Sequence, residues 1–477
     1  MNHFEALFNP RTVAVVGASN ALDKWGATIF TRVLTCPSLK GHLYPINPTA
    51  SEVQGVKAYP TVTDVPEPVD LAVIAVPLPG LLGTVRDCVK KGVKSAIVIT
   101  AGLAEADSDG AKLQEEIVRV AREGGMRFTG PNCNGHFNMS IDLSTLRMEA
   151  PVERGPIGVI SQSGGFGGHI LMCGADMGVG FSKFVSVGNE ADLHFEDILE
   201  YYGQDKETRV ITGYIEGLRK GRDFFRLAKE ITRRKPIVVV KVGKTDAGAQ
   251  AARSHTSAIA GADIVYDAMF KQAGVIRVET VEELFDTASA LLRQPLPKGN
   301  RVGILSSGGG FACVTSDACA RLGLQIAPLS PVTIERLNAV LPPRWPHANP
   351  VDTVAAGFVT YPCLWPLIED ENLDAVLVVD GIGRSMRDSG PSNRVDSPLK
   401  EPGGDELKAL DKLFEHIDKY RKPVIMTSFM SPALRSSPVF AKLREHGILI
   451  QPTPERAARV LSHLVEYSRY LSHVSPD

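Results

Sequence analysis

Short apolar runs, rich in β-branched residues, recur along almost the whole chain, and segments with helical periodicity separate them. Runs of four to six apolar residues bounded by Gly or Pro are typical of strands that are buried on both faces. The pattern predicts an α/β protein built from doubly wound parallel sheets. The runs are TVAVVG (12–17), LAVIAVP (71–77), SAIVIT (95–100), IGVISQSGG (157–165), RVITGYIEG (209–217), PIVVVKVG (236–243), RVGILSSGGG (301–310), AVLVVD (375–380) and KPVIMTS (422–428).

The length of 477 residues exceeds what a single hydrophobic core usually serves. Two breaks are visible, one at 138–156, where periodicity is lost, and one at the proline-rich segment 293–301. We therefore predict three domains, at residues 1–145, 150–294 and 298–470. A polar stretch at 380–406 predicts a long exposed loop in the third domain.

Charge and composition narrow the classes of function. The 52 basic and 54 acidic residues give a net charge of −2, which offers no electrostatic footprint for nucleic acid or an anionic membrane. The seven cysteines are scattered without a C-x-x-C pair, which argues against a disulfide framework or a zinc site. No secretory signal opens the chain, and no apolar stretch is long enough to span a bilayer. We expect a cytoplasmic protein without metal-binding residues.

The second and third predicted domains open alike. GPIGVISQSGGFGG (155–168) and GNRVGILSSGGGFAC (299–313) each predict a strand, a serine, a glycine-rich turn and a helix. Such turns expose unpaired N–H groups at a helix N-terminus and favour a phosphate; the alternative is tight strand–helix packing alone. The repeat predicts a shared phosphoryl site made of Ser161, Gln162, Ser163, Gly164 and Gly165 with Ser306, Ser307, Gly308, Gly309 and Gly310.

Another turn of this kind follows the first predicted strand, where Gly17, Ser19 and Lys24 precede a helix. The stretch lacks the full G-x-G-x-x-G, and the next predicted strand, HLYPINP, ends in Asn47-Pro48 rather than an acidic residue. We therefore expect a nucleotide-type ligand other than NAD, and a nicotinamide dehydrogenase is the least favoured function.

One histidine, His255, stands in RSHTSAIAGAD (253–263) among small and hydroxylated residues. No second histidine or cysteine lies at a metal-ligand spacing from it. The segment predicts a slender loop that carries an imidazole. On its own, an incidental surface histidine would be the simplest interpretation.

Taken together, these stretches resemble the alpha subunits of the nucleoside-diphosphate-forming acyl-CoA synthetases, which include the ADP-forming acetyl-CoA synthetases and the succinyl-CoA synthetase alpha chains. The resemblance implies a Rossmann-like CoA-binding domain followed by two flavodoxin-like domains. It covers nearly the whole chain and rests on the ordered motifs VGAS…KWG, YPINP, VDLAVIAVP, GPNCNG, SQSGG, SVGNEADL, YIEG, SHTSAIAG, SSGGG and NPVD.

The resemblance implies that His255 is phosphorylated and passes the phosphoryl group between an acyl phosphate and a nucleoside diphosphate. Glu216 would hold the imidazole, and the two Ser-Gly turns would bind the phosphoryl group. Coenzyme A would bind to the first domain, with Asn132 near the thiol end. The residues implied for that site are Gly17, Ala18, Ser19, Asn20, Lys24, Asn47, Val76, Pro77, Ile99, Thr100, Ala101 and Asn132.

The resemblance further implies coenzyme A and ATP or ADP with Mg²⁺ as cofactors, and a small carboxylic acid as substrate. The family also needs an ATP-grasp subunit or domain, for which this chain has no room. A separate beta chain, in an α2β2 assembly, is therefore expected to carry the nucleotide site.

Three positions, in two stretches, depart from the family pattern. Ser257 replaces a glycine after Thr256, and Gly167 and Gly168 stand where bulkier residues are common, which predicts a roomier acyl pocket. Two alternatives use the same scaffold, a CoA-dependent lyase and a non-catalytic acyl-CoA-binding or sensing protein. The presence of His255 together with Glu216 and both glycine turns favours the synthetase over the sensing protein, whereas the sequence leaves the lyase open.

Overall fold

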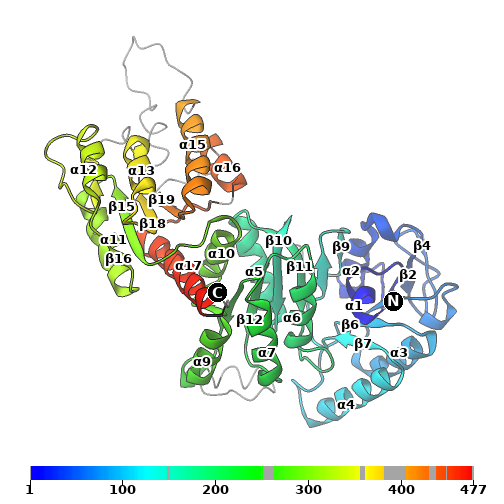
Figure 1. Cartoon of the computed structure of the whole chain (residues 1–477). Helices are drawn as coiled ribbons and strands as arrows, with labels where there is room; N and C mark the ends of the chain where they lie inside the picture. Colours follow the sequence, from blue (N-terminus) through cyan, green and yellow to red (C-terminus); the bar gives the residue numbers. More distant parts are fainter. Residues whose placement is uncertain are drawn as a thin grey trace. The chain divides into compact units, whose positions relative to one another are not determined.

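The structure, a computed structural model, describes residues 2–147, 151–248, 250, 263–354, 360–380, 404–428, 437–446 and 448–474. The chain divides into two compact units, Met1–Leu284 and Phe285–Asp477 (Figure 1). The first unit contains two large sheets and the second unit contains one. The α/β prediction is confirmed. His255 and most of the polar stretch at 380–406 lie outside the described residues.

The first sheet is parallel throughout, with the strand order β2-β1-β5-β6-β7. Val13 and Val15 pack on helix α2, whereas Ala14 and Val16 pack on α3. Burial on both faces is the reason that these strands lack a polar face in the sequence. The elements are β1 (Val13–Val16), β2 (Leu43–Ile46), β5 (Leu71–Ile74), β6 (Ser95–Val98), β7 (Arg127–Thr129), α2 (Trp25–Leu34), α3 (Leu78–Lys91) and α4 (Ser108–Glu123).

The second sheet has the order β14-β13-β12-β10-β11-β8-β9 and is parallel except at β8 and β9. These two strands come from the predicted first domain, yet they complete the second sheet. The division into three domains at residues 1–145, 150–294 and 298–470 stays a prediction. The elements are β8 (His136–Asn138), β9 (Leu143–Ser144), β10 (Glu153–Ser161), β11 (Gly180–Ser186), β12 (Val210–Ile215), β13 (Ile237–Lys241), β14 (Ile276–Val278), α5 (Gly164–Asp176), α6 (Phe195–Gln204), α7 (Gly221–Ile231), α9 (Asp263–Ala273) and α10 (Val281–Arg293).

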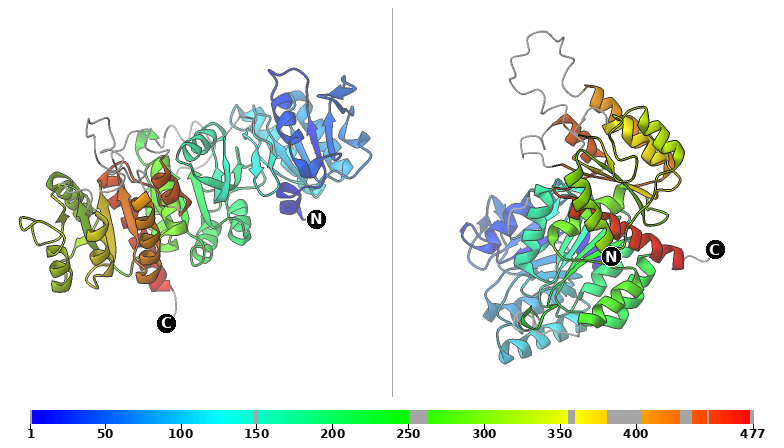
Figure 2. Two further views of the ribbon diagram at one scale, coloured as in Figure 1. Left: turned by 90° about the horizontal axis from the view of Figure 1, so that it is seen from above. Right: turned by 90° about the vertical axis from the view of Figure 1, so that its left-hand side faces the viewer.

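The sheet of the second unit has the order β16-β15-β18-β19, with β17 beside β15. Its strands are parallel, and helices pack against both faces (Figure 2). The elements are β15 (Arg301–Ser306), β16 (Gln325–Ile326), β17 (Val351–Asp352), β18 (Ala375–Val379), β19 (Val424–Thr427), α11 (Gly309–Arg321), α12 (Pro331–Asn338), α13 (Thr360–Glu369), α15 (Gly404–Tyr420), α16 (Pro438–Glu445) and α17 (Pro454–Val474).

Smaller elements complete the first unit. They are α1 (His3–Phe8), the single turns η1 (Pro37–Leu39) and η2 (Val62–Asp64), and the hairpin strands β3 (Glu52–Val53) and β4 (Val56–Lys57). Helix α1 joins the two sheets of this unit, because it contacts β6 and its Phe8 ring stacks on Tyr201 of α6 with 4.3 Å between centroids. Among the helices that are described, none has the length and apolar character needed to cross a bilayer.

Helix α2 approaches the end of β1 closely because two glycines meet there. Gly17 has a φ of +90°, which side chains rarely adopt, and a Cβ on Gly26 would lie 1.9 Å from the Gly17 carbonyl oxygen. The close approach sets where the N-terminus of α2 points.

Replacing Gly26 with alanine should force α2 away from β1. We expect the free energy of unfolding of the first unit to fall by about 1–3 kcal/mol, because the clash is with backbone. Gly83→Ala is the matched control, since its Cβ would meet no described atom within 4 Å. That variant should be neutral or up to about 1 kcal/mol more stable. Equal urea midpoints for both variants would contradict the packing described.

Candidate functional site

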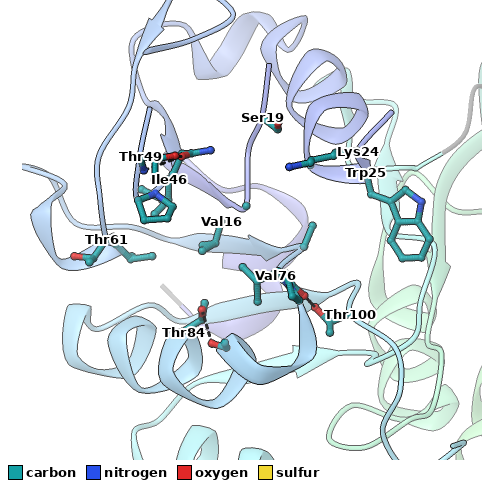
Figure 3. Close-up of a pocket in the computed structure, with 18 of the residues that line it drawn as sticks. Val16, Ser19, Lys24, Trp25, Ile46, Thr49, Thr61, Val76, Thr84 and Thr100 are labelled. Carbon is teal, nitrogen blue, oxygen red and sulfur yellow. Dashed lines mark hydrogen bonds between the residues drawn. The ribbon is translucent and has the colours of Figure 1, made fainter. Parts of the chain in front are cut away.

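A cavity of about 880 Å³ opens at the carboxyl ends of β1, β2, β5 and β6 (Figure 3). Residues one or two positions after these strands line it, among them Gly17, Asn47, Val76 and Thr100. From β1 the chain crosses to β2 on one side and later to β5 on the other. Connections therefore leave in opposite directions at this point, which is where open α/β sheets form their ligand crevices.

The N-terminus of α2 forms one edge of this cavity. Lys24 is the N-cap residue, and no side chain caps the first turn of the helix. The Lys24 side chain extends toward the middle of the cavity, whereas the Trp25 ring turns away from it (Figure 3). An open helix N-terminus beside an ammonium group is a combination that favours an anion such as a phosphate.

Most of the residues predicted for the cofactor line this cavity. They are Gly17, Ser19, Lys24, Asn47, Val76, Pro77, Thr100 and Ala101. Ala18, Asn20, Ile99 and Asn132 are not among the lining residues. Sequence reasoning missed Thr49, Thr61 and Thr84, which also line the cavity, because no motif marks them and only the fold brings them to the strand ends.

Asn47 and Asn20 shape the cavity by tying loops together. The Asn47 side chain donates to the Ala18 carbonyl at 2.8 Å and accepts from the backbone N–H groups of Thr49 and Ala50, both at 3.0 Å. Asn20 donates to the Glu52 carbonyl at 3.0 Å in the β3–β4 hairpin. The loops after β1 and β2 are thereby held in one arrangement.

The two repeated turns have the same construction. Ser161 ends β10 and donates its hydroxyl to the Ser163 carbonyl at 2.7 Å, just as Ser306 ends β15 and donates to the Gly308 carbonyl at 2.8 Å. Helices α5 and α11 begin at Gly164 and Gly309. A Cβ on Gly165, Gly308 or Gly310 would meet no described atom within 4 Å. Both stretches are therefore strand–turn–helix units with open space at the helix start.

Gln162 of the first turn has a structural contact that its sequence position did not suggest. Its Oε1 accepts from the backbone N–H groups of Glu216 and Gly217, the latter at 3.0 Å. Its Nε2 donates to Glu190 Oε2 at 2.8 Å and to the Gly217 carbonyl. The buried amide thus joins the end of β10 to the end of β12 and holds the backbone at Glu216, a residue that is only 6% exposed.

Glu190 is a buried carboxylate that sequence reasoning quoted only within a motif. Its Oε1 accepts from the Phe195 N–H at 2.7 Å, and Arg219 Nε lies 3.8 Å from Oε2. Burial, together with the neighbouring Glu196 carboxylate, raises the pKa of Glu190 to about 8. In the sequence, Glu190 is an acidic residue in a loop after a strand, and this position alone does not predict a buried side chain.

Asn189, beside Glu190, reaches back toward the cavity. Asn132 donates its side-chain amide to Asn189 Oδ1 at 3.3 Å, and the Asn132 N–H donates to the Thr100 carbonyl at 3.0 Å. Thr100 lines the cavity. Hydrogen bonds therefore run from the cavity through Asn132 and Asn189 to the loop that carries Glu190.

The predicted enlargement of an acyl pocket at Gly167 and Gly168 is wrong at Gly167. Both glycines are buried in α5, and a Cβ on Gly167 would lie 2.8 Å from Phe184 Cζ and 3.0 Å from Ser161 Oγ. Gly167 therefore allows α5 to pack against the sheet. In the part of the chain that the structure describes, no three His, Cys, Asp or Glu side chains are grouped so as to hold a metal ion.

Comparisons with known proteins agree with this arrangement. Residues 11–138 match the family model of a CoA binding domain, and residues 154–291 match that of a succinyl-CoA ligase like flavodoxin domain. The chain is 41% identical to the acetate–CoA ligase (ADP-forming) II subunit alpha of Pyrococcus furiosus, over 78% of this chain and 81% of that one. It is 34% identical to the I subunit alpha of the same organism, over 98% of both chains.

A solved structure matches over almost the full length. The dinucleotide-forming acetyl-coenzyme A synthetase 1 of Candidatus Korarchaeum cryptofilum, in complex with phosphate and ADP, is 36% identical and superimposes with a TM-score of 0.86. The match covers 99% of this chain and 98% of that one. Three further relatives are longer, and this chain spans between 50% and 62% of their lengths.

Glu190→Gln should flatten the pH dependence of stability. Because folding raises the pKa of Glu190 from 4.5 to about 8, the native state holds the proton more tightly, and stability falls as pH rises through about 8. Between pH 6 and pH 9 the wild type should therefore lose more unfolding free energy than the variant. Glu123→Gln, at an exposed side chain, should behave like the wild type. Urea titrations measure the free energy of unfolding at each pH. If it falls equally with pH for the Glu190 variant and the wild type, the effect of burial on the Glu190 pKa is contradicted.

Proposed function

The chain belongs to the family of alpha subunits of ADP-forming acyl-CoA synthetases, and on this premise we propose that it binds coenzyme A and carries the phosphoryl group in that reaction. The reaction reversibly converts a carboxylic acid, CoA and ATP into acyl-CoA, ADP and phosphate. The observation that supports this most is the cavity at the strand ends of the first sheet, which hydrogen bonds link through Asn132 and Asn189 to the loop whose Glu190 is bonded to Gln162. The named relatives are ligases, so the lyase and sensing alternatives are less supported.

The cavity fits coenzyme A in size and in chemistry. Its volume of about 880 Å³ is that of a site for a large small-molecule ligand. In this proposal Lys24 and the open N-terminus of α2 bind the phosphates, and Val76 and Pro77 pack against the nucleotide. Asn132 lies beyond Thr100, on the side toward Asn189, so we place the thiol end there.

The phosphoryl step uses the end of β12. We assign His255 as the nucleophile, because it follows β13 in the chain and β13 is the strand beside β12. Glu216 accepts the Nδ1 proton of the imidazole, which leaves Nε2 free to attack phosphorus. The acyl phosphate then loses its phosphoryl group to Nε2 and leaves as the carboxylate, and ADP takes the group from phosphohistidine to become ATP. The helix start at Ser161–Gly165 stabilises the transferred charge, and a contribution from Ser306–Gly310 stays a prediction.

The nucleotide and the partner complete the proposal. ATP or ADP with Mg²⁺ would bind to an ATP-grasp beta subunit in an α2β2 assembly, and the acyl substrate would be a small carboxylic acid. We place the protein in the cytoplasm. The name "subunit alpha" of two relatives supports a partner chain.

Lys24→Ala should weaken coenzyme A binding by about tenfold, because a hydrogen bond to a charged group is worth about 1.5 kcal/mol. Isothermal titration calorimetry of the full chain with CoA measures this. Lys40→Ala, at another exposed lysine of the same domain, is the matched control and should bind CoA like the wild type. An unchanged dissociation constant in Lys24→Ala would remove Lys24 from the site.

His255→Ala should abolish covalent phosphorylation. Incubation of the wild type with the beta chain, radiolabelled ATP and Mg²⁺ should leave an acid-labile, base-stable label on this chain. The label should vanish in His255→Ala and persist in His473→Ala, which alters an exposed histidine near the C-terminus. Label that remains on the His255 variant would refute the assignment.

A further inference from the structure

Two lysines of the second sheet are almost completely buried, and their surroundings differ. Lys183 on β11 is 2% exposed and donates to Asp205 Oδ2 at 2.7 Å. Lys241 at the end of β13 is 3% exposed, yet no carboxylate of the described residues lies within ion-pair distance of it. A buried ammonium without an opposite charge is costly, so proteins normally retain one only where a ligand or partner compensates it.

The contacts of Lys241 place it close to the end of β12, the strand that Glu216 directly follows. Its Nζ donates to the Val242 carbonyl and lies 4.4 Å from the centroid of the Tyr266 ring. The Tyr266 hydroxyl accepts from the Leu218 N–H at 3.1 Å, two residues after Glu216. In the sheet, Lys241 is in register with Ile215, the residue before Glu216. The ammonium is therefore held beside the end of β12.

The charged groups that face Lys241 are Asp263, Arg277, Glu216 and Lys244. Asp263 is engaged by Arg277, which donates to its two oxygens at 2.6 and 3.1 Å, and Lys244 is paired with Glu279. Burial lowers the pKa of Lys241 to about 8, and Asp263 and Glu216 partly oppose that shift. A dianion that arrives at this point would favour the protonated lysine.

We propose that the Lys241 ammonium binds an oxygen of the phosphoryl group that is transferred at the end of β12. This inference rests on the proposed function and adds a residue to it. A phosphoryl dianion beside the Glu216 carboxylate needs positive charge, and the start of α5 supplies only about half an elementary charge. Lys241 supplies a whole charge at the end of the neighbouring strand, on a residue that is only 3% exposed and so is little screened by solvent.

Lys241→Met tests this with the complete enzyme, including the beta chain, because methionine fills much of the same space without the charge. In the direction that consumes acyl-CoA, ADP and phosphate, we expect the KM for inorganic phosphate to rise about tenfold or more, while the KM for CoA changes little. Lys241→Arg should recover most of the phosphate affinity. Lys244→Met is the matched control, since its partner is the exposed Glu279, and it should behave like the wild type.

The pH profile separates binding of the phosphoryl group from a packing role. The wild type should lose phosphate affinity as pH rises through about 8, because Lys241 gives up its proton there. Lys241→Met should lack this basic limb, and Lys241→Arg should shift it to higher pH. If the methionine variant does not fold, the comparison of wild type with Lys241→Arg decides alone, and an unshifted limb overturns the proposal.

The outcomes also separate this inference from the proposed function. Suppose that folded Lys241→Met keeps the wild-type KM for phosphate and still loses phosphate affinity as pH rises, while His255→Ala still loses the label. This result would overturn the role of Lys241 and leave the proposed function standing. Label that never forms on the wild-type chain would instead remove the proposed function itself.

Discussion

The Asp192 carboxylate is the contact on which the arrangement of both sites depends. It is completely buried and accepts from Arg122 Nε at 2.7 Å, from Arg127 Nε at 2.9 Å and from the Phe128 N–H at 2.9 Å. Arg127 and Phe128 belong to β7 of the first sheet, whereas Asp192 lies in the loop between β11 and α6. The Arg122 and Arg127 side chains are 50% and 30% exposed, but removing them would leave the buried carboxylate with an uncompensated charge. The loop is therefore held firmly against the first sheet.

The same loop contacts both sites of the first unit. Asn189 is hydrogen-bonded to Asn132 on the side of the cavity, and Glu190 accepts from Gln162, which also accepts from the Glu216 backbone N–H. Lys241 lies on the strand next to that of Glu216. The proposed reaction requires the thiol of a ligand in the cavity to reach a phosphoryl group at the end of β12. The hydrogen bonds of this loop connect these two places.

The sequence predicted the features that depend on local pattern. Gly17 could be placed from its glycine-rich turn after a predicted strand, whereas Val76 and Thr100 were placed in the same site only by the resemblance to the family. The repeated turns could be predicted because strand, serine, glycine and helix stand in order. Glu190 and Lys241 could not, since their burial and partners come from distant segments. Strands β8 and β9 were missed because they are short, and Gly167 was misjudged because only the fold shows that a Cβ there would meet Phe184.

The central claim is that the cavity of the first sheet and the end of β12 serve one reaction. A crystal structure of the chain with coenzyme A and inorganic phosphate tests it most directly. We expect CoA phosphates at Lys24 and the start of α2, the thiol at Asn132, and phosphate within hydrogen-bond distance of Lys241 Nζ. A coenzyme bound elsewhere, or one whose thiol points away from Asn132, would contradict it.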